Sequence, residues 1–301
     1  MSEVCGKEGR FPAALGVRLS RLRPWCQSGF LLVWLAPLGR WLHSIPACVF
    51  HCYSCPLSSF ACPIGVSANY AALWPVALEA PYLLLGVLLV AGATTGSLAC
   101  GWACPFGFLQ DLLAKVTPRK SALPAWAGLG RYAVLVGLVL VLQLYLGWRG
   151  IPFEEQAVSI CRLCPAGALE AGLPYSLQSV VQGGPWLMSW YKMLILAGFL
   201  ALAVFVHRPW CRLLCPLGGL LALFNRFSLF HLRFNRAECL ECDLCRSRCR
   251  LGVKVDLNIN APGCIRCLEC LKCAAIEPAF ASGWRSAKPP IPVDKSAARS
   301  G

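Results

Sequence analysis

The stretch CGWACPFGFLQDLL, residues 100–113, recurs as CRLLCPLGGLLALF, residues 211–224. Both copies follow an apolar segment, and both contain the motif Cys-x3-Cys-Pro-x-Gly. Proline is well tolerated at the first position of a helix, so each Cys-Pro pair predicts a helix start. The cysteine then lies at the positive end of that helix, which favours a thiolate and therefore metal ligation or thiol chemistry.

A related motif, Cys-x2-Cys-Pro, occurs at Cys52 and again at Cys161, 109 residues later. The Cys-x3-Cys-Pro motif recurs after 111 residues. Two motifs that recur at nearly the same interval predict an internal duplication, covering roughly residues 48–118 and 157–227.

The composition is that of a chain that lies largely in lipid. Of 301 residues, 57% are apolar and 14% are charged, and the mean hydropathy is +0.59. These values argue against a soluble globular chain and against disorder. The 20 cysteines do not indicate a small secreted disulfide scaffold, because the chain is too long and too apolar.

Four apolar segments are long enough to cross a bilayer core of roughly 30 Å. They run over residues 25–49, 82–100, 126–148 and 186–206. Two shorter segments, residues 63–78 and 165–181, are interrupted by Pro, Gly, Ser and Gln, and we interpret them as re-entrant. A six-span alternative distributes Lys and Arg less well between the two faces. The positive-inside rule therefore favours four spans with both termini cytoplasmic, in a multi-pass protein of the cytoplasmic membrane.

The net charge of +14 follows from this topology and does not indicate nucleic-acid binding. The predicted fold class is mainly α: an integral membrane helical bundle of four spans plus re-entrant segments, with internal duplication. A small C-terminal α+β domain follows the bundle; it contains eight cysteines in two runs, which predict the bacterial-ferredoxin type with two [4Fe–4S] clusters. The expected divisions are a basic cytoplasmic tail (1–24), a transmembrane domain (25–228), a ferredoxin-like domain (229–280) and a flexible tail (281–301).

Eight cysteines in two regular runs define the ferredoxin-like domain. The first run has the spacing Cys-x2-Cys-x2-Cys-x3-Cys of a bacterial [4Fe–4S] ferredoxin, and the second closes with two intervening residues. The fourth cysteine of such a run ligates the other cluster. We therefore assign one cluster to Cys239, Cys242, Cys245 and Cys273, and the other to Cys264, Cys267, Cys270 and Cys249.

Two alternatives to clusters are weaker. Paired cysteines also bind zinc tetrahedrally, but eight cysteines without histidine fit clusters better. Disulfides are disfavoured on a cytoplasmic face, where thiols stay reduced. The usual proline after the run is replaced by Arg250 and Ala274, so a three-iron cluster or another fourth ligand in place of Cys273 stays open.

The membrane motifs contribute further cysteines, which the predicted topology sorts by face. On the inner face we expect Cys100, Cys104, Cys211 and Cys215; on the outer face Cys55, Cys62, Cys161 and Cys164. A hydrocarbon core of roughly 30 Å is expected to separate the two sets. Within each set, iron–sulfur ligation, disulfides and structural buried thiols all stay open.

Two polar residues near the inner motifs have weaker functional claims. Asp111 is a single charge in an apolar stretch, and we expect it to face the cytoplasm rather than to accept a quinol proton. His207 directly follows the fourth apolar segment, where an interface residue is a better interpretation than a metal or quinone ligand.

The paired Cys-x3-Cys-Pro motifs after apolar segments, followed by two ferredoxin runs, resemble the NapH and NosR group of polytopic membrane ferredoxins. The resemblance covers about residues 80–275. It implies quinol oxidation at the membrane, electron delivery through cytoplasmic clusters, and a functional requirement for the four inner cysteines. The outer motifs are additional to the usual pattern, so we interpret the chain as a diverged member.

Three functions are compatible with these features. The leading hypothesis is a membrane-bound iron–sulfur electron-transfer protein that links the quinone pool or a cytoplasmic donor to a redox partner protein. A second is a transmembrane thiol–disulfide carrier that uses the outer cysteine pairs. A third is a non-catalytic assembly or regulatory factor for a respiratory metalloenzyme. Whether the chain is itself an enzyme, as a quinol dehydrogenase subunit, stays open.

Overall fold

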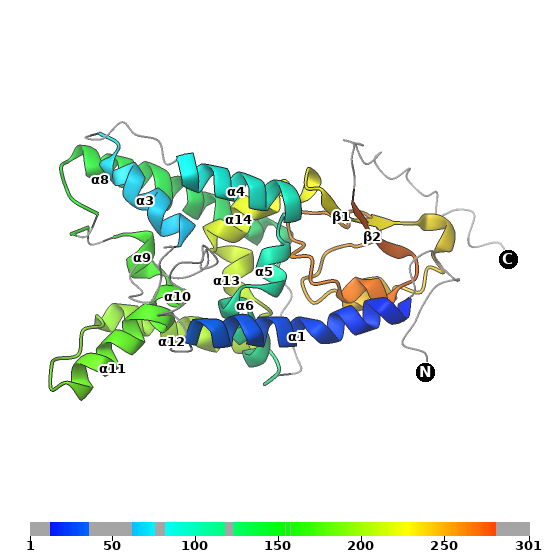
Figure 1. The fold of residues 1–301 in the computed structure, drawn as a ribbon, viewed down its shortest axis with the longest axis horizontal. Coiled ribbons are helices and arrows are strands. Elements are labelled where there is room, and N and C mark those ends of the chain that lie inside the picture. The colour runs from blue at the N-terminus through cyan, green and yellow to red at the C-terminus, as the bar shows by residue number, and fades with distance from the viewer. Residues whose placement is uncertain are drawn as a thin grey trace.

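The computed structural model describes residues 13–35, 62–75, 82–117, 123–153, 155–156 and 158–280. An elongated helical bundle forms one end of the molecule, and a small domain with a two-stranded sheet forms the other (Figure 1). The chain is thus mainly helical with a C-terminal ferredoxin-like domain, as the sequence predicts.

The same succession of helices occurs twice in the bundle. In each copy a long apolar helix is followed by a five-residue helix and then by a helix that starts at a Cys-Pro pair. The first copy is α4 (Tyr82–Thr95), α5 (Leu98–Trp102) and α6 (Pro105–Leu113); the second is α12 (Trp190–Phe205), α13 (Pro209–Leu213) and α14 (Pro216–Leu223). The repeated motif therefore begins a repeated local structure.

The remaining bundle elements precede the first copy (α3), lie between the two copies or follow the second (η4). They are α3 (Pro63–Leu73), η1 (Ala125–Leu129), α7 (Gly130–Ala133), the π-helical η2 (Val134–Val141), α8 (Leu142–Trp148), α9 (Ile160–Leu163), α10 (Pro165–Gly167), the π-helical η3 (Ala168–Gly172), α11 (Leu173–Val181) and η4 (Phe224–Arg226). Two of them, α3 and α10, begin near the middle of the bundle, immediately after a cysteine (Figure 1).

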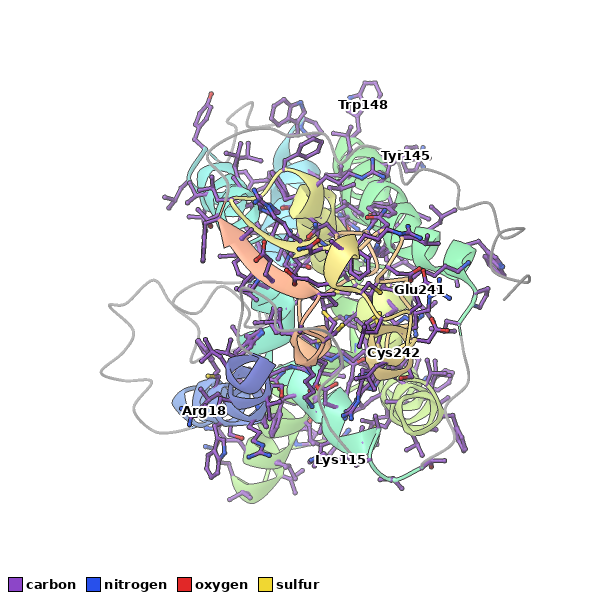
Figure 2. The ribbon with its side chains drawn as sticks, turned by 90° about the vertical axis from the view of Figure 1, so that its right-hand side faces the viewer. Arg18, Lys115, Tyr145, Trp148, Glu241 and Cys242 are labelled. Atoms are coloured by element: carbon purple, nitrogen blue, oxygen red, sulfur yellow. The ribbon has the colours of Figure 1, made fainter. Side chains whose placement is uncertain are left out.

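The outer surface of the bundle is strongly apolar. Leu83 on α4 is 75% exposed, Leu194 on α12 63% and Trp148 on α8 82%, and Tyr145 and Trp148 project outward at one edge (Figure 2). In the described part of the chain, one helix, Trp126–Trp148, is long and apolar enough to cross a bilayer, and α4 and α12 are shorter apolar helices. The first of the four expected spans lies partly outside the described residues.

The first helix, α1 (Ala13–Leu35), begins well before the apolar segment that the sequence predicts. Residues 13–24, expected to be part of a tail, form its first turns and lie along the C-terminal domain (Figure 1). Gly16 allows this contact, because a Cβ there would collide with the carbonyl group of Leu271. Helix α1 therefore connects the bundle to the small domain.

The small domain is closed by two antiparallel strands. Strand β1 (Phe230–Phe234) pairs with β2 (Ile276–Phe280), in a register that places Phe230 opposite Phe280. Between the strands lie η5 (Arg236–Glu238), α15 (Leu244–Arg248) and η6 (Glu269–Lys272). The two cysteine runs occupy the loops around these short helices, so the sheet brings the ends of the two runs together.

Candidate iron–sulfur centres

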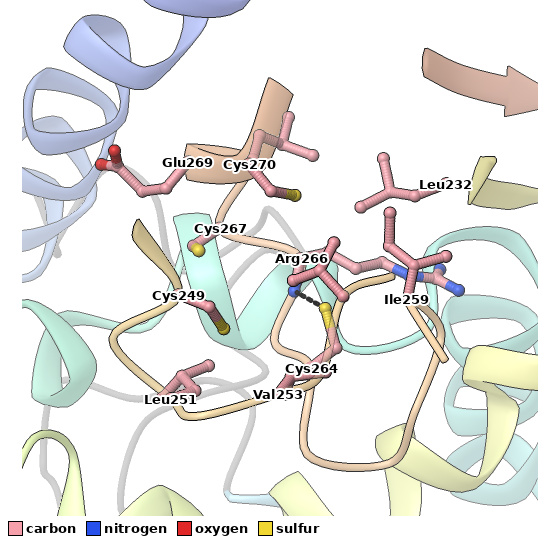
Figure 3. Close-up of a pocket in the computed structure, with 12 residues that line it drawn as sticks. Leu232, Cys249, Leu251, Val253, Ile259, Cys264, Arg266, Cys267, Glu269 and Cys270 are labelled. Carbon is pink, nitrogen blue, oxygen red and sulfur yellow. Dashed lines mark hydrogen bonds between the residues drawn. The ribbon is translucent and has the colours of Figure 1, made fainter. Parts of the chain in front are cut away.

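Four cysteines of the small domain line one cavity. They are Cys249, Cys264, Cys267 and Cys270, and their sulfur atoms surround a common space (Figure 3). This is the set that the sequence assigns to one cluster, with three ligands from the second run and one from the first. The other walls of the cavity are mostly apolar and include Leu232 and Ile259, which keep the space shielded from water.

The two cysteine runs have the same backbone conformation. In each run, the residues two and four positions after the first cysteine adopt a positive φ: Glu241 and Asp243 in the first run, Arg266 and Leu268 in the second. Such conformations cost roughly 1–3 kcal/mol each in non-glycine residues and cluster at functional sites. In the second run they turn the backbone so that successive cysteines face the same space.

Backbone amides donate hydrogen bonds to the first sulfur of each run. The N–H of Glu241 donates to Cys239 Sγ at 3.4 Å, and the N–H of Arg266 donates to Cys264 Sγ at 3.3 Å. Hydrogen bonds of this kind stabilise a thiolate and tune the potential of a bound cluster. The local structure of both runs therefore fits iron–sulfur ligation.

The first run is gathered less completely than the second. Cys239, Cys245 and Cys273 pack in one apolar core cluster, but Cys242 is exposed and takes part in a disulfide. This differs from the prediction that its thiolate binds iron, because a disulfide sulfur offers no thiolate. Assembly of the predicted first cluster therefore requires reduction of this bond.

Burial strongly favours the protonated thiols in the second site. It raises the pKa of Cys264 to about 12, and it also raises the pKa of Cys267 and Cys270. In an empty site these thiols would therefore be neutral. Bound iron would supply the positive charge that holds them as thiolates.

A second cavity lies at the boundary between the small domain and the bundle. Its walls include all four inner-motif cysteines, Cys100, Cys104, Cys211 and Cys215. The duplicated helices thus bring two cysteine pairs to one space. The site is asymmetric in one respect: Gln110 Nε2 donates to Cys211 Sγ at 3.4 Å, and the sequence offered no signal for this contact.

Each Cys-Pro pair of this site begins a helix. The N–H of Gly107 donates to Cys104 Sγ at 3.4 Å, and that of Gly218 donates to Cys215 Sγ at 3.4 Å. These sulfur atoms therefore cap α6 and α14, as the motif predicts.

The two cavities share one residue, because Cys264 lines both of them. Hydrogen bonds fix this junction: Ser97 Oγ donates to the Cys264 carbonyl at 2.6 Å, and Trp102 Nε1 donates to the Arg266 carbonyl at 3.1 Å. The Arg266 guanidinium, fully buried, donates in return to the carbonyl of Thr95 at 2.8 Å. The small domain and the bundle therefore form one continuous site.

A buried ion network supports the second cavity. Asp111 accepts from Arg208 Nε at 2.8 Å and Nη2 at 2.5 Å, and from Arg23 Nη2 at 2.5 Å. Arg208 also donates to the Cys100 carbonyl at 2.9 Å, and Arg23 to the Gly101 carbonyl at 3.0 Å. The network thus holds the turn of α5 that carries Cys100.

The sequence suggests that Asp111 faces the cytoplasm, but in the structure this residue is buried. Burial alone would raise the pKa of its carboxyl, but the charges and hydrogen bonds of Arg208 and Arg23 hold this pKa below its ordinary value. His207 is also buried, with Nε2 3.4 Å from Asp111 Oδ1, and burial lowers its pKa to about 4. The sequence could not reveal this network, because Arg23, Asp111 and Arg208 are about 90 to 190 residues apart in the sequence.

The predicted outer cysteines do not lie far from the inner ones. Cys62 and Cys161 pack on the apolar cluster that contains Cys100, and Cys164 packs on the cluster against which Cys104 and Cys215 also pack. The two sets thus share apolar clusters, which differs from the expectation that a hydrocarbon core separates them. Cys55 lies outside the described residues.

In the described part of the chain, no group of three or more His, Cys, Asp or Glu is close enough to hold a single metal ion. That holds for the eight ferredoxin cysteines as well. A cubane spreads its thiolates over four iron corners, whereas a zinc ion gathers them at about 2.3 Å.

Comparisons with known proteins agree with this arrangement. A family model described as a 4Fe-4S binding domain matches the chain twice, at residues 76–124 and 188–235. These two ranges contain the two Cys-x3-Cys-Pro motifs.

The chain is 31% identical over 240 residues to the uncharacterized protein MJ0750 of Methanocaldococcus jannaschii, which covers 76% of the chain and 90% of that protein. It is 27% identical to the putative electron transport protein YccM of Escherichia coli, over 70% of the chain and 62% of that protein. It is 30% identical to the regulatory protein NosR of Pseudomonas aeruginosa, over 57% of the chain and 22% of that protein. The chain thus spans less than two thirds of YccM and less than a quarter of NosR. No solved structure matches it.

The fold and the cysteine-lined cavities define an iron–sulfur protein of the ferredoxin class with a duplicated helical part. The chain belongs to the NapH/NosR-like ferredoxin family, as a diverged member.

Proposed function

We propose that this protein carries electrons in a membrane through a chain of at least three iron–sulfur clusters. The observation that carries the proposal is the position of Cys264, which lines both the ferredoxin cavity and the cavity of the inner motifs. Clusters in these two sites would be separated by a single residue. Each cluster accepts and releases one electron at a time.

The proposed ligands are assigned from the spacing of the two cysteine runs and, for the second and third clusters, are supported by the two cavities. The ferredoxin-like domain holds two clusters, one on Cys239, Cys242, Cys245 and Cys273 and one on Cys249, Cys264, Cys267 and Cys270. The third is held by Cys100, Cys104, Cys211 and Cys215. The amides of Gly107 and Gly218 stabilise its thiolates, and the buried ion network keeps α5 in position.

A membrane location is supported by the exposed apolar surface of α4, α8 and α12, which would contact lipid. The expected arrangement is multi-pass, with both termini and the ferredoxin-like domain at the cytoplasmic face. Electrons would enter from the quinone pool or a cytoplasmic donor and leave to a redox partner protein. The electron-transport description of YccM agrees with this role.

Iron and acid-labile sulfide per chain, measured on full-length protein purified without oxygen, test the proposal. At least about twelve irons are expected, because each cubane holds four. The Cys104→Ser, Cys215→Ser double variant should lose about four of them and one EPR signal, while the ferredoxin signals persist. Zinc without sulfide would overturn the proposal, and unchanged iron in the double variant would remove the third cluster.

A further inference from the structure

Three cysteines that neither the ferredoxin runs nor the inner motifs use lie inside the bundle. Cys62 begins α3, Cys161 lies in α9, and Cys164 joins α9 to α10. Helix α3 contacts α9 directly, and α12 contacts both α9 and α10. Segments about a hundred residues apart in the sequence therefore bring these thiols to the same part of the bundle.

The packing places these thiols next to the inner-motif site. Cys62 and Cys161 pack on an apolar cluster that contains Cys100 and Leu217, and Cys215 packs on the same cluster. The thiols therefore border one contiguous apolar core. The three cysteines thus continue the row of cysteine sites away from the ferredoxin-like domain.

Cys164 makes the same connection on a second side. It packs on the cluster of Phe106, Phe199 and Trp210, and Cys104 and Cys215 pack on that cluster as well. The ring centroids of Phe106 and Phe199 are 5.2 Å apart, so this cluster is a compact aromatic layer.

The local structure also repeats that of the inner motifs. Cys62 and Cys164 each occupy the N-cap of a helix whose first residue is proline, as Cys104 and Cys215 do. All three thiols are half-buried.

We propose that Cys62, Cys161 and Cys164 ligate a fourth iron–sulfur cluster, which receives electrons from the cluster of the inner motifs. The proposal rests on the proposed function and extends it, because it adds a carrier on the side of the bundle away from the ferredoxin-like domain. In the step itself the inner cluster is oxidised by one electron and the fourth cluster is reduced by one. No bond forms or breaks, and no proton moves.

The test compares three variants of the full-length protein, purified in detergent without oxygen. The first carries Cys62→Ser, Cys161→Ser and Cys164→Ser. The second is the inner-motif double variant Cys104→Ser, Cys215→Ser. The third, Cys26→Ser, is a matched control, because Cys26 is a free, exposed thiol on α1. Iron, acid-labile sulfide and EPR spectra after stepwise reduction are recorded for each.

The wild type and the Cys26→Ser control should hold about sixteen irons, or about fifteen if the fourth cluster has three irons. The triple variant should lose those three or four irons and one EPR signal, and should keep the ferredoxin and inner-motif signals. Unchanged iron in the triple variant overturns the fourth cluster, as does a disulfide joining Cys161 to Cys164 in the purified wild type.

The two proposals fail in different ways. If only the inner-motif double variant loses iron, the proposed function stands and the fourth cluster does not. If only the triple variant loses iron, the third cluster of the proposed function is wrong. Should the triple variant fail to fold, Cys164→Ser alone decides: a change confined to one EPR signal supports the fourth cluster, and an unchanged spectrum overturns it.

Discussion

The hydroxyl of Ser97 donates a 2.6 Å hydrogen bond to the carbonyl oxygen of Cys264. Ser97 caps the short helix that carries Cys100, and Cys264 is the first cysteine of the second ferredoxin run. The Asn225 side chain donates to the same carbonyl at 2.8 Å. Two polar side chains of the duplicated bundle therefore hold a cluster ligand of the small domain against the inner-motif site.

Gly101 should be essential for this junction. A Cβ at this position would lie 2.5 Å from the carbonyl oxygen of Ile265, so Gly101→Ala forces the two parts apart. We expect a loss of about 1–3 kcal/mol in the free energy of unfolding, as is usual for overpacking, and slower electron transfer into the inner-motif cluster.

The matched control is Gly198→Ala on α12, where nothing lies within 4 Å. That variant should gain roughly 0.5–1 kcal/mol, because alanine replaces glycine in a helix. Thermal unfolding without oxygen measures both, and freeze-quench EPR follows the order in which the clusters are reduced. Equal stability and equal rates in the two variants would show that the junction does not depend on this close approach.

The sequence was informative where chemistry depends on spacing. Both ferredoxin runs, the cysteine set of the second site and the Cys-Pro helix starts could be predicted, because ligand spacing and proline geometry are local properties. The sequence left open whether Cys100, Cys104, Cys211 and Cys215 converge on one site. It depends on how the two repeats pack, which local spacing does not determine.

The position of the outer motifs was not predictable from hydropathy. A topology derived from charge distribution assigns Cys164 to a face, but it does not give a depth. In the structure, α10 begins near the middle of the bundle (Figure 1), and Cys164, which precedes it, packs on the same cluster as Cys104 and Cys215. The burial of Asp111 was unpredictable for a related reason, because its partners Arg23 and Arg208 are distant in sequence.

Asp111→Asn should be strongly destabilising. It removes the negative charge that Arg208, fully buried, and Arg23 share. Removing one partner of a buried ion pair costs about 3–5 kcal/mol, since the remaining charge is left uncompensated. Asp243→Asn is the control, because this carboxylate is 75% exposed and pairs only loosely with Arg246; it should change stability by less than about 1 kcal/mol. Comparable losses of thermal stability in the two variants would contradict the buried network.

Stability should fall as the pH is lowered from 7.5 to 5.5, in part because of His207. Its pKa is lowered by burial to about 4 in the folded protein, so the unfolded chain takes up a proton near pH 6.5 while the folded protein does not. The contribution of neutral His207 to the free energy of unfolding is fully present above pH 6.5 and is progressively lost toward pH 4. Over the stated interval the loss is about 1 kcal/mol. In His207→Gln the melting temperature should depend less on pH; an identical dependence would show that His207 does not titrate as described.

The exchange of fourth ligands between the two ferredoxin runs has a spectroscopic consequence. Cys249 belongs to the first run but lines the cavity of the second. Cys273 belongs to the second run but does not line that cavity; it lies in the core cluster that contains Cys245, against which Cys239, Cys249 and Cys270 also pack. Cys249→Ser should therefore alter the same EPR signal as Cys264→Ser, and Cys273→Ser the same signal as Cys245→Ser. Each variant is expected to lose up to about four irons, or to convert one cluster to a three-iron form. If Cys249→Ser and Cys245→Ser instead altered one common signal, each run would hold its own cluster, and Cys273 would replace Cys249 as the fourth ligand of the second site.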